Sequence, residues 1–444
     1  MSESSAGAAG DNGGWDAERQ HRMGVAADAV LRLGLMFMAA GTGGYRIIRG
    51  MKRAGRALGF DRLDAQISVT TITCTFHRGD HFRTVVAGQD SPGVDASRIE
   101  ALETLTHHLD RRVDAEWLNA RLDRIESGVV KRWTLPVLIL AAGLACAGFA
   151  VLNHFSLADV LVVAVAAGCG QAVRGLLLRR HVRQLGAVAA AAVTACLVFW
   201  AVIELLGLAG VVEPAAAAPG FVASVLFVVP GFPLFSAIID LSRFDFTAGL
   251  SRLTYAATVI VAATFSVALV SGVTGMAPPP RPATVDDPRW FLLAAAASFV
   301  GIAGFALLFN SSRRMVLIAA VVGMASNVLR LVLVQAGASA YAAAFLGGLA
   351  IGLLGAVASK KADIPRITTT VPASVIMIPG PAMFGSVYAL TSGNIELGVD
   401  AAATAVMTVL AIGAGLVTAR MLTDRDWVLG RYIDLEKPLA EFEK

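Results

Sequence analysis

The sequence predicts an α-helical polytopic membrane protein with ten transmembrane helices, arranged as two inverted five-helix repeats and preceded by a small soluble α/β domain. Three observations predict this fold class. Of the 444 residues, 56% are hydrophobic and 16% are charged, which is more apolar surface than a soluble chain of this length can bury. Ten stretches after residue 133 are long and apolar enough to cross a bilayer. Residues 229–250 also have a counterpart in residues 378–399.

The N-terminal part differs in composition from the rest of the chain. Residues 1–23 are rich in Ser, Gly, Ala and Asp and lack the apolar segment of a signal peptide, so we expect a disordered tail. Residues 24–130 have the pattern of a soluble cytoplasmic α/β domain. Its expected elements are helices over 25–40 and 45–58, a strand over 66–76, a returning strand over 82–86 and a long charged helix over 97–125.

The second expected helix is strongly basic. A solvated face is the favoured interpretation, and acidic lipid headgroups or a nucleotide are alternative partners. Near the hairpin turn, His77, Asp80 and His81 lack a further ligand at metal-binding spacing, so we predict no metal site and no cofactor. The basic residues of the helix are Arg46, Arg49, Lys52, Arg53 and Arg56.

Ten apolar stretches follow, and their Ala and Gly content suits close packing of helices in a membrane. They divide the chain into a first repeat (131–276), an extracytoplasmic linker (277–289), a second repeat (290–421) and a cytoplasmic tail (422–444). The ten stretches are 134–152, 159–178, 185–206, 220–241, 253–273, 290–309, 314–335, 338–357, 370–391 and 398–420.

The basic residues orient these spans. Lys and Arg gather in alternate loops, and the positive-inside rule then places both termini in the cytoplasm. The exception is the linker, where Asp286 and Asp287 offset two arginines. The residues that carry the bias are Lys131, Arg132, Arg179, Arg180, Arg183, Arg243, Arg252, Arg313, Arg314, Lys360, Lys361, Arg366, Arg425, Arg431 and Lys437.

The two halves of the membrane region resemble each other. A shift of 149 residues aligns Pro230-Gly231 with Pro379-Gly380, and Gly148-Phe149-Ala150 recurs as Gly304-Phe305-Ala306. Since each half holds an odd number of spans, the second half must enter the membrane from the opposite side. Inverted repeats of this kind are typical of secondary transporters, which bind substrate near the midplane between broken helices.

The Pro-Gly pairs fall near the middle of the fourth and ninth spans, where they predict broken helices. We expect the breaks to line the transport path, because unpaired backbone groups are tolerated in a membrane only against protein or a cavity. Kinks that serve packing alone are the alternative. The expected substrate-binding residues are Pro230, Gly231, Phe235, Ser236, Pro379, Gly380, Phe384, Ser386, Gln171 and Asn327.

Ionisable residues within spans are candidates for function. Asp240 is the expected coupling carboxylate, since it follows the first break by less than three turns, although a surface charge paired with Arg243 is an alternative. Arg174 and Arg330 are equivalent positions in the two halves and are possible partners for an anion. Snorkelling of both side chains to the membrane surface is the alternative for them.

The segment LRLGLMFMAAGTGGYRIIRGMKRAGRALGF resembles the opening of the threonine/serine exporter family of bacterial inner-membrane carriers. Gly41, Tyr45, Arg46 and Met51 carry the resemblance, together with the ten spans and the two mid-span Pro-Gly pairs. The resemblance implies export of threonine and serine driven by the proton motive force. In related systems the two halves are separate proteins, and the substrate there can be a dicarboxylate such as succinate.

We therefore expect a proton-coupled exporter of small polar amino acids in the bacterial inner membrane, with its site between the fourth and ninth spans. A dicarboxylate exporter is one alternative, and a channel or receptor with a cytoplasmic sensing domain is another. We expect no enzyme, since no catalytic set converges within the spans. The expected partners are the small-molecule substrate, protons and the lipid bilayer, with a homo-oligomer possible and no nucleic acid.

Overall fold

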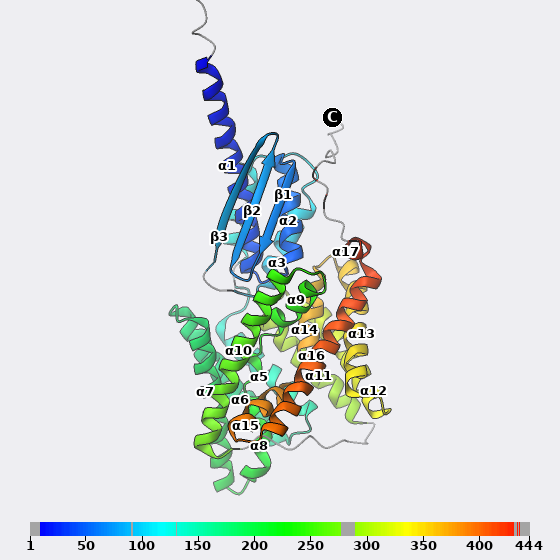
Figure 1. Ribbon diagram of the computed structural model, residues 1–444. Coiled ribbons are helices and arrows are strands. Elements are labelled where there is room, and N and C mark those ends of the chain that lie inside the picture. Colours follow the sequence, from blue (N-terminus) through cyan, green and yellow to red (C-terminus); the bar gives the residue numbers. More distant parts are fainter. Residues whose placement is uncertain are drawn as a thin grey trace, which may run out of the picture. The chain divides into compact units, whose positions relative to one another are not determined.

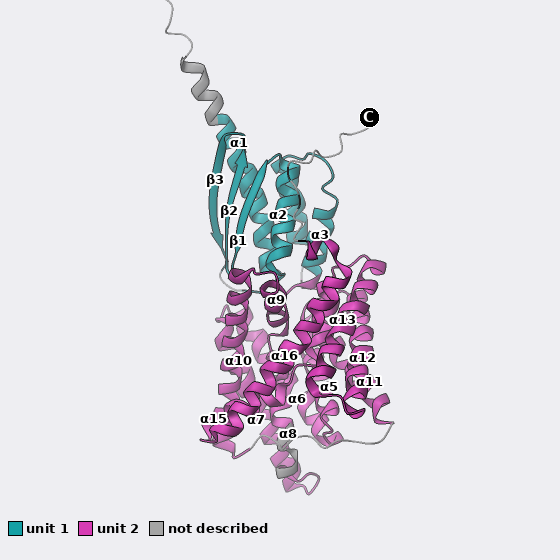
Figure 2. Ribbon diagram, turned by 45° about the vertical axis from the view of Figure 1, so that its right-hand side comes forward, with its two compact units in different colours: residues 1–93, 97–130, 431–444 teal, residues 94–96, 131–430 magenta. Residues whose placement is uncertain are grey.

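The computed structural model describes residues 9–89, 92–129, 131–276 and 289–429, together with residues 433 and 435. Residues 1–8 of the predicted tail, 277–288 of the predicted linker and most of 430–444 lie outside the described residues. The chain divides into two units (Figure 2), which are treated separately below. Unit 1 comprises residues 1–93, 97–130 and 431–444, and unit 2 comprises residues 94–96 and 131–430.

Unit 1 combines helices with an antiparallel sheet (Figure 1). The sheet has the strand order β1-β2-β3. Gly41, between the first two helices, has a φ of 86°, a left-handed conformation that favours glycine. The elements are α1 (Ala9–Ala39), α2 (Gly44–Leu58), β1 (Arg62–Ile67), β2 (Thr71–Arg78), β3 (His81–Gly88), α3 (Ala96–His107) and α4 (Ala115–Gly128).

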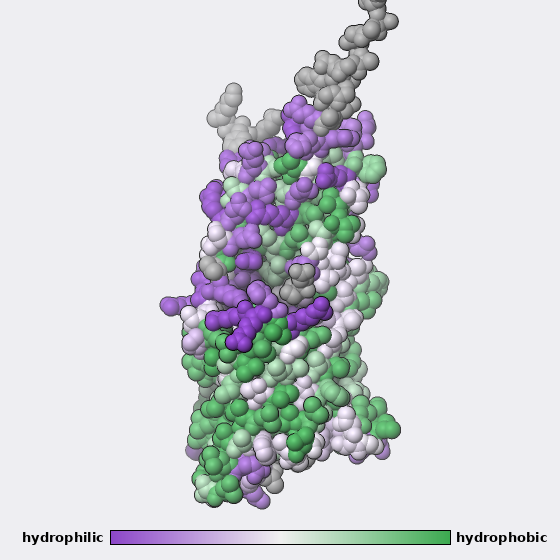
Figure 3. Space-filling model, turned by 90° about the vertical axis from the view of Figure 1, so that its left-hand side faces the viewer, coloured by the Kyte–Doolittle hydropathy of each residue, from purple (hydrophilic) through white to green (hydrophobic). Residues whose placement is uncertain are grey.

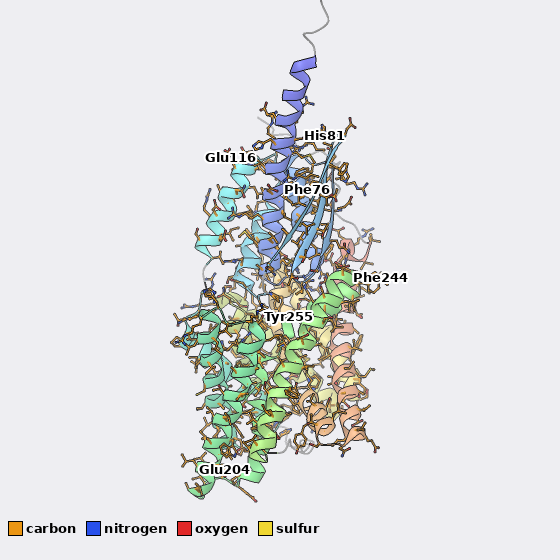
Figure 4. The ribbon with its side chains drawn as sticks, turned by 60° about the vertical axis from the view of Figure 1, so that its left-hand side comes forward. Phe76, His81, Glu116, Glu204, Phe244 and Tyr255 are labelled. Carbon is orange, nitrogen blue, oxygen red and sulfur yellow. The ribbon has the colours of Figure 1, made fainter. Side chains whose placement is uncertain are left out.

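One face of the sheet forms the core of unit 1 with the helices. Alternate residues of β2, Ile72, Cys74 and Phe76, are buried, as expected for a strand with one face on a core. The pairing is in register, with Leu63 opposite Phe76. Large helix side chains pack into the same core, among them Phe37, Ile47, Met51, Leu102, Leu118 and Leu122. Figure 4 labels Phe76, on β2, and His81, at the start of β3.

Three predicted boundaries in unit 1 were wrong. Helix α1 begins at Ala9, inside the segment predicted as a disordered tail, where helix-forming residues include the i,i+4 ion pair Glu18–Arg22 at 3.7 Å. The predicted strand 66–76 is divided by a turn in which Ser68 Oγ accepts from the amide of Thr71 at 2.9 Å. The predicted helix 97–125 is two helices, because Asp114 accepts from the Trp117 amide at 2.6 Å and starts α4 anew.

The Cys74 thiol should resist alkylation in the folded protein. Its side chain is fully buried, and burial raises its pKa to about 12. A raised thiol pKa leaves less thiolate at neutral pH, and the thiolate is the nucleophile. Peptide mapping after N-ethylmaleimide treatment at pH 7.5 should show Cys74 unmodified until denaturant is added.

A Thr84→Cys variant provides the control, because Thr84 is exposed on the neighbouring strand β3. It should be modified without denaturant. Equal rates at both positions in the folded protein would contradict the burial of Cys74.

Unit 2 is helical throughout its described residues. Its helices are α5 (Leu135–Leu152), α6 (Leu157–Arg179), α7 (Gln184–Leu208), α8 (Pro214–Ala223), the 3₁₀ turn η1 (Leu226–Val228), α9 (Gly231–Leu241), α10 (Phe246–Thr274), α11 (Trp290–Leu308), α12 (Arg313–Gln335), α13 (Ala340–Ala362), α14 (Arg366–Val375), α15 (Gly380–Thr391), α16 (Ile395–Thr423) and α17 (Arg425–Val428).

These helices make the chain a multi-pass membrane protein. Among the described residues, eight helices are long and apolar enough to cross a membrane, or up to ten spans if each of two bent pairs counts as one. The bent pairs are the predicted fourth and ninth spans. The surface of unit 2 on the side drawn in Figure 3 is largely hydrophobic, and exposed Leu161, Val261, Phe265 and Leu269 lie on its helices. Figure 4 shows Phe244 and Glu204 at opposite ends of the unit.

The loops of the two halves turn in the same way. Each half has left-handed residues at four matching loop positions, although the residue type differs in all four pairs. Because φ between +50° and +90° is rare outside glycine, four matches indicate a common backbone path. The pairs are His154 and Asn310, His181 and Gly337, Gly210 and Asp363, and Phe244 and Gly393.

Helices α5 and α11 pack closely through small residues. A Cβ added to Gly148 would lie 2.7 Å from the Ala297 carbonyl oxygen, and one added to Gly304 would lie 2.9 Å from the Ala145 amide nitrogen. Phe149 and Phe305, the residues that follow these glycines, stack edge to face with centroids 5.9 Å apart. Each helix therefore offers the other an equivalent surface, with the pair of phenylalanines at its centre.

Candidate functional site

Both predicted breaks are present, and both have the same backbone. Pro230 has φ −81° and ψ 60°, and Pro379 has φ −78° and ψ 66°. Across each proline an amide reaches back two residues, from Gly231 to the Val229 carbonyl (2.9 Å) and from Gly380 to the Ile378 carbonyl (2.8 Å). This is an inverse γ-turn, which suits a residue that has a fixed φ and no amide hydrogen. The helices on either side bend by 64° at the first break and 53° at the second.

The two breaks contact each other in a reciprocal way. A Cβ on Gly231 would lie 2.6 Å from Val375 Cγ2, and a Cβ on Gly380 would overlap the side chain of Leu226. With the 149-residue shift, Gly231 corresponds to Gly380 and Leu226 to Val375, so the same contact is made twice. Glycine is needed at both positions because the opposite segment occupies the space of a side chain.

The predicted residues beside the breaks are buried in unit 2. Phe235 is 0% exposed and Phe384 is 4% exposed, each at least one turn beyond its proline. Ser236 is buried and its hydroxyl has no hydrogen-bond partner among the described residues, whereas Ser386 is 7% exposed. The structure thus brings the residues of the two breaks into one region.

Two polar side chains of α12 are hydrogen-bonded to each other. Asn327 is fully buried; its Nδ2 donates to Ser298 Oγ at 2.9 Å, and its Oδ1 accepts from Arg330 Nε at 2.9 Å. The Ser298 hydroxyl in turn donates to the Ala294 carbonyl. Asn327 therefore holds Arg330 in place.

The equivalent positions of α6 are different. Gln171 Oε1 and Arg174 Nε are both buried, and neither has a hydrogen-bond partner in the described part of the chain. The phenol of Tyr255, on α10 (Figure 4), is close enough to act electrostatically on Arg174. Buried polar atoms are usually satisfied, so this acceptor and this donor, one turn apart, are available to a polar ligand.

Asp240 is part of a buried ion pair. Its carboxylate accepts from the Arg252 guanidinium, and the two side chains are 2% and 4% exposed. Arg252 was predicted to be a loop charge, but it lies within α10, which begins seven residues before the predicted span. Asp240 lies six positions before Phe246, and Arg252 lies six positions after it. Residues at equal distances from the turn between α9 and α10 can meet, and this spacing is the signal in the sequence that could have identified the pair. Arg243, the alternative partner, donates to the Trp427 carbonyl at 3.0 Å.

The three threonines of α14 were missed by the sequence analysis. Thr368, Thr369 and Thr370 are buried just before the second break, and so is Ser374 on the same helix. Three of these four hydroxyl groups donate to backbone carbonyls: Thr368 to Pro365 at 2.7 Å, Thr370 to Arg366 at 3.1 Å and Ser374 to Thr370 at 2.7 Å. The run of three threonines next to a Pro-Gly pair is the signal that could have identified them.

Two spans broken at their middle and packed against each other are typical of multi-pass membrane transporters. The chain belongs to the threonine/serine exporter family. One model of that family, with the description "Putative threonine/serine exporter", matches residues 28–274, and a second, with the description "Threonine/Serine exporter, ThrE", matches residues 294–422. The family predicted from the opening segment is thereby confirmed.

The names of two curated relatives mention a different substrate, succinate. The Probable succinate transporter subunit YjjP of Escherichia coli (strain K12) is 25% identical over 252 residues, which cover 55% of this chain and 93% of the relative. The protein of the same name from Klebsiella aerogenes is 25% identical over 229 residues, or 50% of this chain and 84% of the relative. No solved structure matches the chain.

Filling the contact between the breaks should destabilise unit 2. In a Gly380→Leu variant the new side chain would occupy the space of Leu226, and overpacking of this kind costs about 1–3 kcal/mol. Thermal unfolding of the purified protein in detergent should show a lower midpoint. Gly385→Leu is the matched control on the same helix, because a Cβ there meets nothing within 4 Å. Equal midpoints for the two variants would contradict the contact.

Removal of one partner of the buried ion pair should lower the stability of the protein, whereas removal of both partners should not. Asp240→Leu takes away the carboxylate that faces Arg252, and breaking a buried pair costs about 3–5 kcal/mol. The double variant Asp240→Leu/Arg252→Met removes both charges and should recover most of that loss. Thermal unfolding midpoints of both single variants and the double variant form the cycle. Additive effects of the two changes would show that the pair is not coupled.

Proposed function

We propose that the protein is a secondary exporter of threonine and serine across the bacterial inner membrane. The observation that carries the proposal is the reciprocal contact between the broken spans at Pro230-Gly231 and Pro379-Gly380. Breaks of this type expose backbone carbonyls and helix N-termini, which bind polar and charged groups inside a membrane. The substrate site lies beside this contact, between α9 and α15.

The two halves act as inverted repeats. Each half holds four continuous spans and one broken span, five in all, and an odd number reverses the direction of the second half. The reciprocal contacts at the breaks and at Gly148 and Gly304 are those expected about a two-fold axis in the membrane plane. Transport then proceeds by rocking of one half against the other. The distribution of Lys and Arg among the loops supports cytoplasmic termini.

Gln171 and Arg174 fit the two charged ends of an amino acid. The amide oxygen of Gln171 can accept from the substrate ammonium group, and Arg174 can donate to its carboxylate. Both atoms are buried and have no hydrogen-bond partner among the described residues. Ser236, also without a partner for its hydroxyl, offers a contact to the hydroxyl of threonine or serine. Phe235, Phe384 and Ser386 complete the proposed surroundings. Asn327, with Arg330, is the proposed equivalent contact in the second half.

Asp240 remains the proposed coupling residue, now together with Arg252. Protonation of Asp240 removes the charge that faces the Arg252 guanidinium, so the pair opens only when a proton binds or another anion takes its place. The pair joins α9, which begins at the first break, to α10. Its opening is therefore suited to link proton movement to movement of the broken span.

Export of a dicarboxylate is the second candidate. The names of the curated relatives favour it, and so does the absence of any carboxylate within 4 Å of Arg174 or Arg330 among the described residues. Each arginine stands 17 residues into its helix, about 26 Å along the axis. If the halves are inverted, Arg174 and Arg330 lie near opposite membrane surfaces. One succinate molecule would then contact the two arginines at different stages of transport and not at the same time.

Efflux from loaded cells tests the proposal. Cells are loaded with labelled threonine, serine or succinate, and efflux is compared with and without an uncoupler. We expect efflux of threonine and serine that the uncoupler abolishes. Arg174→Gln removes a charge-assisted hydrogen bond worth about 1.5–3 kcal/mol, so efflux should fall by about 10- to 100-fold.

Arg314→Gln is the matched control, since Arg314 is an exposed arginine at the start of α12. It should leave efflux unchanged, with both variants present in the membrane at equal amounts. Efflux of succinate alone would favour the second candidate. Absence of efflux for all three solutes would refute both.

A further inference from the structure

Three arginines of α2 share one face of the helix in unit 1. Arg46, Arg49 and Arg53 stand about one turn apart. The facing residues come from α3, where Glu103 and His107 are also one turn apart. Arg46 and Glu103 form an ion pair whose side chains are 13% and 17% exposed, so these two faces are in contact. Helix α2 and all of α3 after Ala96 belong to unit 1 (Figure 2).

Acidic and basic groups surround this contact. Arg53 experiences the field of Glu103 and, as a smaller effect, that of Asp110, which lies three residues beyond the end of α3. His107 in turn experiences the fields of Arg53, Arg49 and Arg46. Arg49, Arg53 and His107 therefore belong to one cluster beside the Arg46–Glu103 pair.

Other arginines in unit 1 have an evident structural role. Arg78 Nε donates to the Gly59 carbonyl at 2.9 Å, and Arg112 donates to the Arg56 carbonyl at 3.3 Å. These carbonyls end α2, where cations are favourable. By contrast, Arg49 and Arg53 make no hydrogen bond or ion pair among the described residues, and both are half-buried. A solvated face, the favoured interpretation of the sequence, would leave them exposed.

The cationic groups of this cluster oppose one another. Burial lowers the pKa of Arg53 to about 10, and the neighbouring Arg49 adds to the effect. Partial desolvation also lowers the pKa of His107, which stays exposed at one edge, and the neighbouring Arg53 is the next cause. Glu103 and Asp110 act on Arg53 without forming an ion pair with it among the described residues, and half-buried like charges that no ion pair neutralises are unfavourable. An anion between the arginines would add attractive interactions that offset their repulsion.

We propose that unit 1 binds a small multivalent oxyanion, a phosphate or a dicarboxylate, between α2 and α3. Arg49 and Arg53 are the donors, because the planar guanidinium matches two oxygens of such a group. His107, exposed on α3, lies at the rim of the site. The same chemistry is supplied by a free anion or by the phosphate of an acidic lipid headgroup, and this site is separate from the proposed transport path.

Calorimetric titration of the full-length protein tests the site. The protein is held in nanodiscs of phosphatidylcholine and titrated with pyrophosphate or malonate at constant ionic strength. Arg49→Gln/Arg53→Gln should weaken binding at least about tenfold, since two charge-assisted contacts are lost. Arg62→Gln/Arg83→Gln is the matched control, because it removes two arginines that are exposed on the sheet, and it should leave the affinity unchanged.

Thermal unfolding provides a second readout. It distinguishes a variant that has lost the anion site from a variant that has lost its fold. Without anion, Arg49→Gln/Arg53→Gln should melt at or above the wild-type midpoint, because two repelling charges are gone. With anion, only the wild type and the control should gain stability. In nanodiscs that contain phosphatidylglycerol, a gain limited to proteins with Arg49 and Arg53 would identify the lipid headgroup as the source. Equal affinity and equal thermal gain in all variants, or no binding of any probe, would overturn the proposal.

Discussion

The backbone at the two Pro-Gly breaks is the constraint on which the structure of unit 2 depends. A hydrocarbon environment offers no water to satisfy an unpaired amide or carbonyl, so a span can be interrupted only where protein covers the interruption. Here each break closes with an inverse γ-turn around its proline, at Pro230 and Pro379. Each break is also covered by the segment that precedes the other one, because Gly231 packs on Val375 and Gly380 on Leu226. Each break therefore depends on the other for part of its protein cover.

The two halves differ in their buried polar side chains although their backbone conformations match. Left-handed residues recur at matching loops, yet the buried pair of Asp240 and Arg252 occurs in the first half, where the second half has alanine at both equivalent positions. The amide oxygen of Asn327 accepts a hydrogen bond from Arg330, whereas that of Gln171 has no hydrogen-bond partner among the described residues. The two halves therefore share a backbone path but differ in their buried polar groups.

Unit 1 uses charge in two ways that its composition does not distinguish. Arg78, on β2, and Arg112, after the end of α3, donate to carbonyls at the C-terminal end of α2 and so stabilise the fold. Arg49 and Arg53, within α2 itself, have no such acceptor among the described residues. Their position beside α3 gives a cationic cluster whose cost is recovered only when an anion is present.

The sequence by itself determined the class of the protein, its family and the location of its spans. Apolar length, the Pro-Gly pairs and the 149-residue echo are local properties, and the ten predicted stretches correspond to eight continuous helices and two bent pairs. Boundaries that depend on a capping side chain, such as Asp114 at the start of α4, were missed because capping competes with an otherwise continuous helical pattern. Only the tertiary structure decided which polar residues meet. The partner of Asp240, the chain of contacts from Arg330 to Ser298 and the facing of α2 with α3 all depend on how helices distant in sequence pack, and no periodicity within one helix specifies the face of another.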